Sequence, residues 1–317
     1  MRVVYFGTPD FAVESLDAIM QSARHEVAAV VTVPDRQAGR GQKVVYSPVK
    51  QYALDHQLPL LQPEKLRDPH FLEDLQKYNA DIFVVVAFRM LPEAVWNMPP
   101  HGTFNLHASL LPRYRGAAPI NWAIINGERE TGVTTFLLNH QIDEGNLLLQ
   151  ETTPIGDHET AGSLHDRLAD MGRDLVIRTL DALADNTITP RPQNGESCPA
   201  PKIFKNDCQI NFTQTAAKVD CFIRGLSPYP AATLTLVNSK GDSIPFKILN
   251  AEPSLEKHEY PCGTLICDGK RVLKVATNDG FINILELQMA GKKKNKVEDF
   301  LRGNNITDWK PAQSKIS

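Results

Sequence analysis

The chain has 317 residues and a net charge of −3, with 42% hydrophobic and 22% charged residues, the proportions of a soluble globular protein. No stretch approaches the roughly 18 consecutive apolar residues of a membrane span. Met1 leads straight into an apolar segment, without the basic and apolar regions of a secretion signal. We therefore expect a cytoplasmic protein with no membrane partner and, at this length, two domains.

Strand and helix signals alternate in the first half of the chain. Short apolar runs, typical of strands buried on both faces, lie at residues 1–6, 26–33, 81–87 and 103–107. Helical patterns lie at about residues 11–22, 47–57, 70–78 and 116–126. This alternation predicts an α/β fold with a Rossmann-like, doubly wound, mostly parallel sheet. The turn Gly7-Thr8-Pro9-Asp10 stands where a dinucleotide site would have G-x-G-x-x-G, which disfavours a nicotinamide enzyme.

The predicted strand at 103–107 carries a polar pair, Asn105 and His107. Residues two apart in a strand share a face, and open α/β sheets bind ligands at the carboxyl ends of their strands. An amide donor beside an imidazole suits acyl transfer, in which an oxyanion is held while a proton moves. For either residue alone, a satisfied turn residue is the competing interpretation.

Asp143 lies between two further predicted strands, residues 133–140 and 146–155. Its carboxylate could orient the imidazole, although Asp and Gly also favour such turns for backbone reasons. A long amphipathic helix is predicted at 160–185, with Thr160 as its N-cap.

The C-terminal part of the chain has a different pattern, a Pro-rich segment followed by short predicted strands. Residues 188–205 hold four prolines and predict a linker between a domain at 1–187 and another at 206–317. After a helix near 214–225, short strands are predicted at 231–237, 244–252, 262–268, 271–277 and 281–289. Turns at this spacing indicate a small all-β barrel domain.

Charge divides unevenly along the chain. Residues 200–317 contain 17 Lys and Arg against 12 Asp and Glu, and the first 199 contain 17 against 25. A basic part joined to an acidic part indicates a polyanionic partner, with solvated surface charge as the alternative.

The cysteines give no sign of a metal site or a disulfide framework. They are five in number, form no C-x-x-C pair and all lie late in the chain, at Cys198, Cys208, Cys221, Cys262 and Cys267. We expect reduced thiols and no bound metal.

The segment NLHASLLPRYRGAAP, residues 105–119, resembles the signature of the folate-dependent formyltransferases. The resemblance runs from Arg2 to about Leu301. It implies an OB-like C-terminal barrel, 10-formyltetrahydrofolate as formyl donor and no metal. FGTPDFA at 6–12, PDRQAGRGQK at 34–43, SPVK at 47–50 and IRGLSPYPAA at 223–232 resemble the members whose acceptor is initiator methionyl-tRNA. On this basis we expect that tRNA as partner, and a monomer.

The resemblance also implies roles for individual residues. Asn105, His107 and Asp143 align with the family's catalytic residues. Folate contacts are implied for Ser109-Leu110-Leu111-Pro112 and for Phe88, Arg89, Met90 and Leu91. The second segment departs from the family's Ala-Tyr-Gly pattern, because it is one residue shorter and has Arg89 near the Gly. For Ser109-Leu110-Leu111-Pro112 taken alone, a segment that simply ends the strand is the competing interpretation.

Basic residues are the candidate tRNA contacts. The loop at 34–48, long for its place between a strand and a helix, contains Arg36, Arg40 and Lys43, and the resemblance implies that it enters the acceptor stem. The resemblance of TPDF makes Phe11 a candidate contact for the methionine side chain, and for Phe11 by itself a core residue at the start of a helix is the competing interpretation. An outer electrostatic track is predicted from Arg224, Lys292, Lys293, Lys294 and Lys296.

Two alternatives stay open at this point. One is a formyltransferase acting on a small amine, which needs neither the basic loop nor the basic C-terminal part. The other is a non-catalytic RNA-binding protein with the same fold.

Overall fold

A computed structural model describes residues 1–38, 43–306 and 308–312, with side chains left undescribed at 37, 38 and 43. The chain forms two compact units. The first comprises Met1–Pro119, Glu130–Pro154 and His165–Pro201, and the second Ile120–Arg129, Ile155–Leu164 and Lys202–Ser317.

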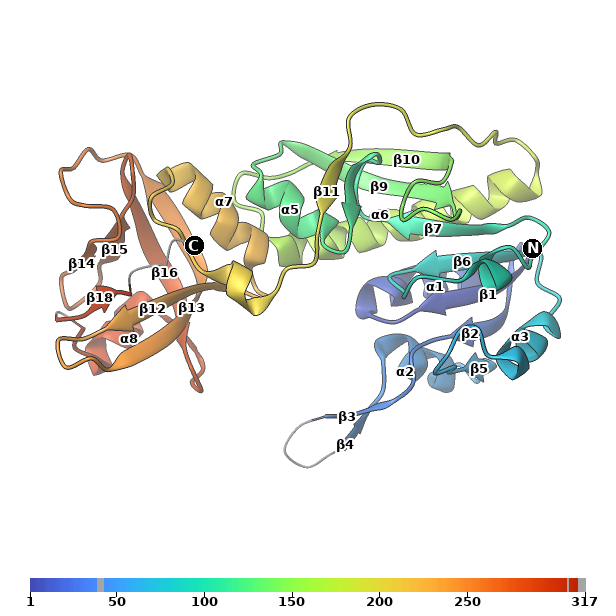
Figure 1. Cartoon of the computed structure of the whole chain (residues 1–317), viewed down its shortest axis with the longest axis horizontal. Coiled ribbons are helices and arrows are strands. Elements are labelled where there is room, and N and C mark those ends of the chain that lie inside the picture. Colours follow the sequence, from blue (N-terminus) through green and yellow to red (C-terminus); the bar gives the residue numbers. More distant parts are fainter. Residues whose placement is uncertain (39–42, 307, 313–317) are drawn as a thin grey trace. The chain divides into compact units, whose positions relative to one another are not determined.

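A seven-stranded sheet forms the first unit, in the order β10-β9-β7-β6-β1-β2-β5 (Figure 1). Its strands are β1 (Arg2–Gly7), β2 (Glu26–Val31), β5 (Leu60–Leu61), β6 (Ile82–Val86), β7 (Thr103–His107), β9 (Glu130–Leu137) and β10 (Leu147–Pro154). The five strands from β7 to β5 are parallel, while β9 runs antiparallel to β7 and β10 antiparallel to β9. The predicted Rossmann-like, mostly parallel sheet is confirmed.

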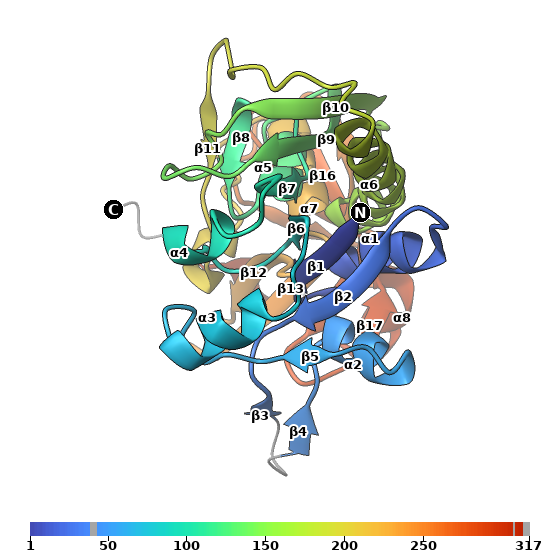
Figure 2. The same ribbon diagram turned by 90° about the vertical axis from the view of Figure 1, so that its right-hand side faces the viewer.

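Helices cover both faces of this sheet, and Figure 2 shows α1 and α6 on one side with α3 and α4 on the other. The helices of the first half are α1 (Asp10–Gln21), α2 (Pro48–Asp55), α3 (Pro69–Gln76), α4 (Glu93–Trp96) and α5 (Pro119–Ile125), and α6 (Ala161–Ala184) follows. Successive side chains of a strand point to opposite faces of the sheet. Tyr5 donates a hydrogen bond to Ala12 O of α1, whereas Phe6 packs with Phe71 of α3 and Val95 of α4. Both faces are therefore apolar, as the unbroken hydrophobic strands require.

Two small sheets were not predicted. β3 (Arg36–Ala38) and β4 (Lys43–Val45) pair antiparallel inside the segment expected to be a loop. β8 (Arg113–Gly116) pairs in parallel with β11 (Cys198–Ala200), and Arg191 forms a bridge with Leu147. Part of the Pro-rich segment thus runs along the first unit. Strands of three or four residues are too short to show a periodic pattern.

The second unit is an antiparallel barrel-like sheet in the order β14-β15-β16-β13-β12-β18, with β17 beside β16. Its strands are β12 (Ala232–Val237), β13 (Ser243–Ser254), β14 (Leu265–Cys267), β15 (Leu273–Ala276), β16 (Phe281–Met289), β17 (Lys294–Lys296) and β18 (Lys310–Pro311). Its helices are the 3-10 helix η1 (Lys205–Cys208), α7 (Ala216–Leu226) and α8 (Val297–Gly303). The predicted C-terminal β-barrel is confirmed, and the helices η1 and α8 were missed.

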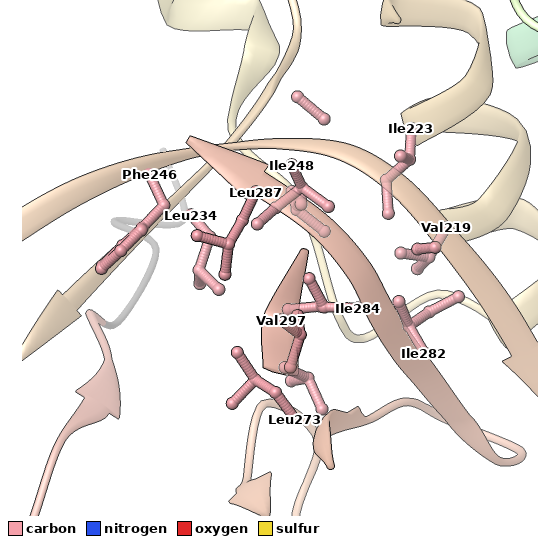
Figure 3. Packing of buried hydrophobic residues seen from close by; sticks show 14 of the residues in the cluster. Val219, Ile223, Leu234, Phe246, Ile248, Leu273, Ile282, Ile284, Leu287 and Val297 are labelled. Atoms are coloured by element: carbon pink, nitrogen blue, oxygen red, sulfur yellow. The ribbon is translucent and has the colours of Figure 1, made fainter. Parts of the chain in front are cut away.

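One apolar core fills this barrel (Figure 3). Leu234 and Phe246 point inward from β12 and β13, Ile282 and Ile284 come from β16, and Ile223 comes from α7. The alternate residues of β12 and β13 therefore face outward, where Thr233 stands opposite Lys247.

Candidate active site

Asn105 and His107 lie on one face of β7, at its C-terminal end. Their register partners are Phe136 and Thr134 of β9. Leu106 points the other way, since a Cβ built on Gly172 of α6 would lie 2.6 Å from the Leu106 side chain. Asn105 and His107 thus occupy the face opposite α6, as strand alternation predicts.

The imidazole of His107 is 8% exposed and has a fixed orientation. Its Nε2 lies 2.8 Å from the backbone carbonyl oxygen of Tyr114. A carbonyl can only accept a hydrogen bond, so Nε2 carries hydrogen in either protonation state. Nδ1 is therefore the nitrogen that can gain or lose a proton, and it lies 4.0 Å from Oδ2 of Asp143.

Asp143 is held beside the imidazole by the backbone of Gly116, at the end of β8. Its Oδ2 accepts a hydrogen bond from the backbone N–H of Gly116 at 2.9 Å, and its side chain is 14% exposed. Gly116 has φ +124°, and a Cβ there would lie 2.6 Å from Ala200 O, so glycine is required at that donor. Asp143 itself adopts φ 55°, a left-handed conformation that costs energy outside glycine and clusters at functional sites.

From the Pro-rich segment, Gln193 fixes the loop that contains Asp143. Its amide nitrogen donates to the carbonyl oxygens of Asp143 and Gly145 at 2.8 and 2.9 Å. Its amide oxygen accepts from the guanidinium of Arg115 at 2.7 Å. Sequence reasoning missed Gln193 and the backbone groups of Tyr114 and Gly116. Backbone groups carry no residue signature, and a lone Gln in a Pro-rich stretch has none either.

Asn105 carries an unusual buried atom. Its Oδ1 is buried without a hydrogen-bond partner in the protein. A buried unsatisfied polar atom costs about 1–3 kcal/mol, so its retention beside His107 points to a function rather than to packing. A half-turn of the amide exchanges this oxygen for the N–H₂ group, which can donate to a carbonyl-derived oxygen.

The segment Ser109–Pro112, one of the two predicted folate contacts, is braced from β9 and β10. The hydroxyl of Thr134 donates to Ser109 O at 2.6 Å and accepts from Leu111 N–H at 3.3 Å. Gln150 Nε2 donates to Leu111 O at 2.9 Å. Leu110 lies against Gly132, where a Cβ would approach it to 2.7 Å. The result is a rigid apolar shelf after β7.

The segment 88–91 follows β6, the neighbouring strand. Phe88 packs edge-on against Phe6 and Leu91 is buried, whereas Met90 is 67% exposed. Arg89 donates to the carbonyl oxygens of Pro63 and Glu64. Arg89 therefore ties this segment to the loop after β5. Burial lowers the pKa of Arg89.

The strands β3 and β4 form a hairpin within the segment 34–48, here called the basic hairpin. It projects from the sheet in Figure 1, and Arg36 is exposed at the start of β3. Val44, Val45 and Tyr46 are 55%, 53% and 43% exposed, so apolar surface accompanies the charge. Lys43 begins β4, and Arg40 lies outside the described residues.

A buried lysine anchors the base of this hairpin. Lys50 Nζ donates to both carboxylate oxygens of Asp35, at 2.8 and 2.6 Å, and to Gln62 Oε1 at 3.0 Å. Gln62 in turn donates to Val33 O and to Asp35. Ser47 caps α2 through Lys50 N–H and contacts Thr32. Both ends of the segment 34–48 are thereby fixed to the sheet.

Replacing Lys50 with methionine should lower the melting temperature by roughly 3–8 °C, because the Asp35 carboxylate loses its cation. Asp35 keeps a 32% exposed side chain, which limits the loss. Lys50 holds the pKa of Asp35 below its usual value. The stabilisation is thus present above the unfolded pKa of about 3.9 and fades as pH falls through the folded pKa. The difference between wild type and variant in thermal scans should shrink below about pH 4.

The matched control is Lys77→Met, which breaks an exposed pair with Asp74 and should change the melting temperature little. An equal shift in the two variants, or a Lys50→Met difference that persists at pH 3, would contradict the anchoring role.

The remaining predicted tRNA contacts differ in accessibility. Lys292, Lys293, Lys294 and Lys296 are exposed around β17. Arg224 is different, because its side chain is 13% exposed, pairs with Asp220 at 2.7 Å and donates to Glu159 O. Phe11 is 7% exposed, with its ring edge-on to His165.

Other site types find little support within the described residues. They contain no group of three or more His, Cys, Asp or Glu side chains placed to hold a metal ion. Among these residues, no helix is both long and apolar enough to cross a membrane.

The chain belongs to the formyl transferase family. Residues 1–180 match the formyl transferase family model and residues 202–305 match the model of the formyl transferase C-terminal domain. A relative from Bacteroides fragilis named methionyl-tRNA formyltransferase is 53% identical over 313 residues, covering 97% of this chain and 96% of the relative. Another of that name, from Flavobacterium johnsoniae, is 47% identical over 310 residues, with 97% and 98% covered.

Solved structures share the fold at lower identity. The sugar 3N-formyl transferase WlaRD, solved with dTDP and 5-N-formyl-THF, superposes with a TM-score of 0.63 at 20% identity, over 92% of this chain and 99% of that one. HypX from Aquifex aeolicus in complex with tetrahydrofolic acid gives a TM-score of 0.64 at 19% identity, over 99% and 51%.

Proposed function

We propose that this chain transfers the formyl group of 10-formyltetrahydrofolate to the α-amino group of initiator methionyl-tRNA, for translation initiation in the cytoplasm, and that it acts as a monomer. The observation that carries the chemistry is the placement of the Asp143 carboxylate 4.0 Å from Nδ1 of His107, with Asn105 on the same strand face. The relatives at 47–53% identity support the choice of acceptor.

Asn105 stabilises the charge that develops on the formyl oxygen. The neutral amine, accessible near pH 7 because an α-amino group has a pKa of about 7.7–8.0, forms a bond to the formyl carbon. The formyl oxygen then becomes an oxyanion. The amide N–H₂ of Asn105 donates to it from a buried position, where such a donor is worth more than in water.

His107 and Asp143 move the proton. The attacking nitrogen must lose one proton, and N10 of the folate must gain one as its bond to the formyl carbon breaks. Nδ1 of His107 takes up the first and supplies the second, while the Asp143 carboxylate stabilises the imidazolium in between. The Tyr114 carbonyl keeps the ring oriented by accepting from Nε2.

Two segments at the carboxyl ends of β6 and β7 are the proposed folate contacts. The braced shelf Ser109–Pro112 lies after β7, and residues 88–91 lie after β6, so both flank the site of transfer. The buried orphan oxygen of Asn105 fits a site completed by a polar group of the substrate. No protein metal is needed for these steps.

The acceptor is proposed to meet the basic hairpin through Arg36, Arg40 and Lys43, and the exposed lysines at 292–296. Phe11 remains a proposed methionine contact. Arg224 is left out of this surface, because its guanidinium is engaged by Asp220 and Glu159. Residues 1–187 are the proposed catalytic domain and 206–317 the tRNA-binding domain, joined by 188–205. The separate family matches at 1–180 and 202–305 support this division.

Incubation with 10-formyltetrahydrofolate and competing amines tests the proposal. Initiator methionyl-tRNA, free methionine and an amino sugar are offered together, and the formylated products are identified by mass. Formyl-methionyl-tRNA should dominate. Preferential formylation of the amino sugar would indicate a small-amine enzyme, and no formylated product at all would favour a non-catalytic RNA-binding protein.

A further inference from the structure

Two exposed aromatic rings of the second unit each lie beneath a lysine. Tyr229 is 79% exposed and Phe204 is 60% exposed. The ammonium of Lys247 lies 6.0 Å from the centre of the Tyr229 ring, and that of Lys202 lies 5.5 Å from the centre of the Phe204 ring. Both distances are within the range of cation–π attraction. Both side chains are thus open to a binding partner.

The two pairs are linked through η1, β12 and β13. Phe204 precedes η1, and its carbonyl oxygen accepts from the thiol of Cys208 at 3.3 Å. The next residue, Gln209, forms a bridge with Thr233 of β12. Thr233 is the register partner of Lys247, the lysine above Tyr229. Lys247 is also close enough to Cys208 to act on its pKa, lowering it against the larger raising effect of burial. A chain of contacts through η1, β12 and β13 thus connects the two pairs.

An aromatic plane beside an ammonium group matches a nucleotide, which offers a flat base and a phosphate. Base–aromatic stacking accepts any base, because every base has a π face, and the lysine supplies the phosphate contact. The excess of 17 Lys and Arg over 12 Asp and Glu from residue 200 onward favours a polyanion over an acidic or neutral surface. A base still stacked inside a helix cannot offer its face, so the partner must present unstacked nucleotides.

We propose that Phe204 and Tyr229, with Lys202 and Lys247, form a stacking surface for unstacked nucleotides of the tRNA acceptor. This inference rests on the proposed function for the identity of the RNA. It adds a contact of a different physical kind from the lysine track around β17, since stacking does not release counterions.

Binding of the full-length protein to fluorescently labelled, uncharged initiator tRNA tests this surface, by anisotropy at several salt concentrations. Tyr229→Ala and Phe204→Ala should each weaken binding roughly 5- to 100-fold. Their slopes of log K against log salt should equal that of wild type. Lys247→Met should instead reduce the slope by about 0.7–0.9. Tyr229→Phe, which keeps the ring, should bind like wild type.

Tyr260→Ala is the matched control, because Tyr260 is a 53% exposed tyrosine of the same unit whose ring contacts His258 and Phe281. A thermal scan of each variant serves to check that its fold is kept. The proposal is overturned if both alanine variants bind like wild type, if Tyr260→Ala loses as much as they do, or if Tyr229→Phe loses as much as Tyr229→Ala. The readout does not depend on catalysis, so a failure of the proposed formyl transfer would appear separately, as absent product from charged tRNA.

Discussion

His107→Gln should lower the single-turnover rate of formyl transfer by about 10²–10⁴-fold, the contribution of a positioned general acid–base group. Glutamine is close to histidine in volume, and its amide nitrogen can take the place of Nε2 and donate to the Tyr114 carbonyl. It cannot carry a proton between the amine and N10. Single-turnover rates with saturating donor measure the effect, and the Kd of a folate analogue should change little.

His101→Gln serves as the control, because His101 is an exposed residue at the other end of β7. It should leave the rate unchanged. A His107→Gln variant with a rate within threefold of wild type would remove the imidazole from the mechanism.

Asn105→Ala should cost about 10²–10³-fold in kcat, the usual loss when one oxyanion donor is removed. Its effect on stability should be small or favourable, because Asn105 Oδ1 is a buried atom without a protein partner and its removal relieves an unsatisfied group. The expected combination is a melting temperature at or above that of wild type with a large loss of turnover.

Asn105→Asp tests the effect of charge at this position while keeping the shape of the side chain. Aspartate is isosteric but places a carboxylate where the oxyanion forms, so it should lose more activity than alanine does. Equal kcat in wild type, Asn105→Ala and Asn105→Asp would mean that Asn105 does not contact the reacting carbonyl. A melting temperature of Asn105→Ala well below that of wild type would mean that Asn105 contributes to packing instead.

The parts of the fold that sequence predicts well are those with a long periodic pattern. The buried strands β1, β2 and β6 carry long apolar runs. In β7, the alternation within TFNLH is enough to place Asn105 and His107 on one face. Asp143 could be connected to them only by resemblance, because it lies 36 positions after His107 in the chain. Its approach depends on a left-handed backbone conformation and on the Gly116 amide.

What supports the site could not be predicted from residue types. The Tyr114 carbonyl orients the imidazole and Gln193 holds the Asp143 loop, yet neither belongs to a recognisable motif. The hairpin β3–β4 rests on Lys50, whose partner Asp35 lies 15 residues away. Such contacts form when distant segments pack, so they appear only in the folded chain. Arg224 shows the converse, since a basic residue in a basic domain is engaged internally.

A double-mutant cycle of His107→Gln and Asp143→Asn tests the central claim most directly, with single-turnover formation of formyl-methionyl-tRNA as the readout. If the carboxylate acts through the imidazole, the double variant should be about as slow as the slower single variant, because residues that act as a unit are non-additive. Losses that multiply, so that each substitution slows the enzyme by the same factor whether or not the other is present, would show that Asp143 and His107 act independently and would contradict the account.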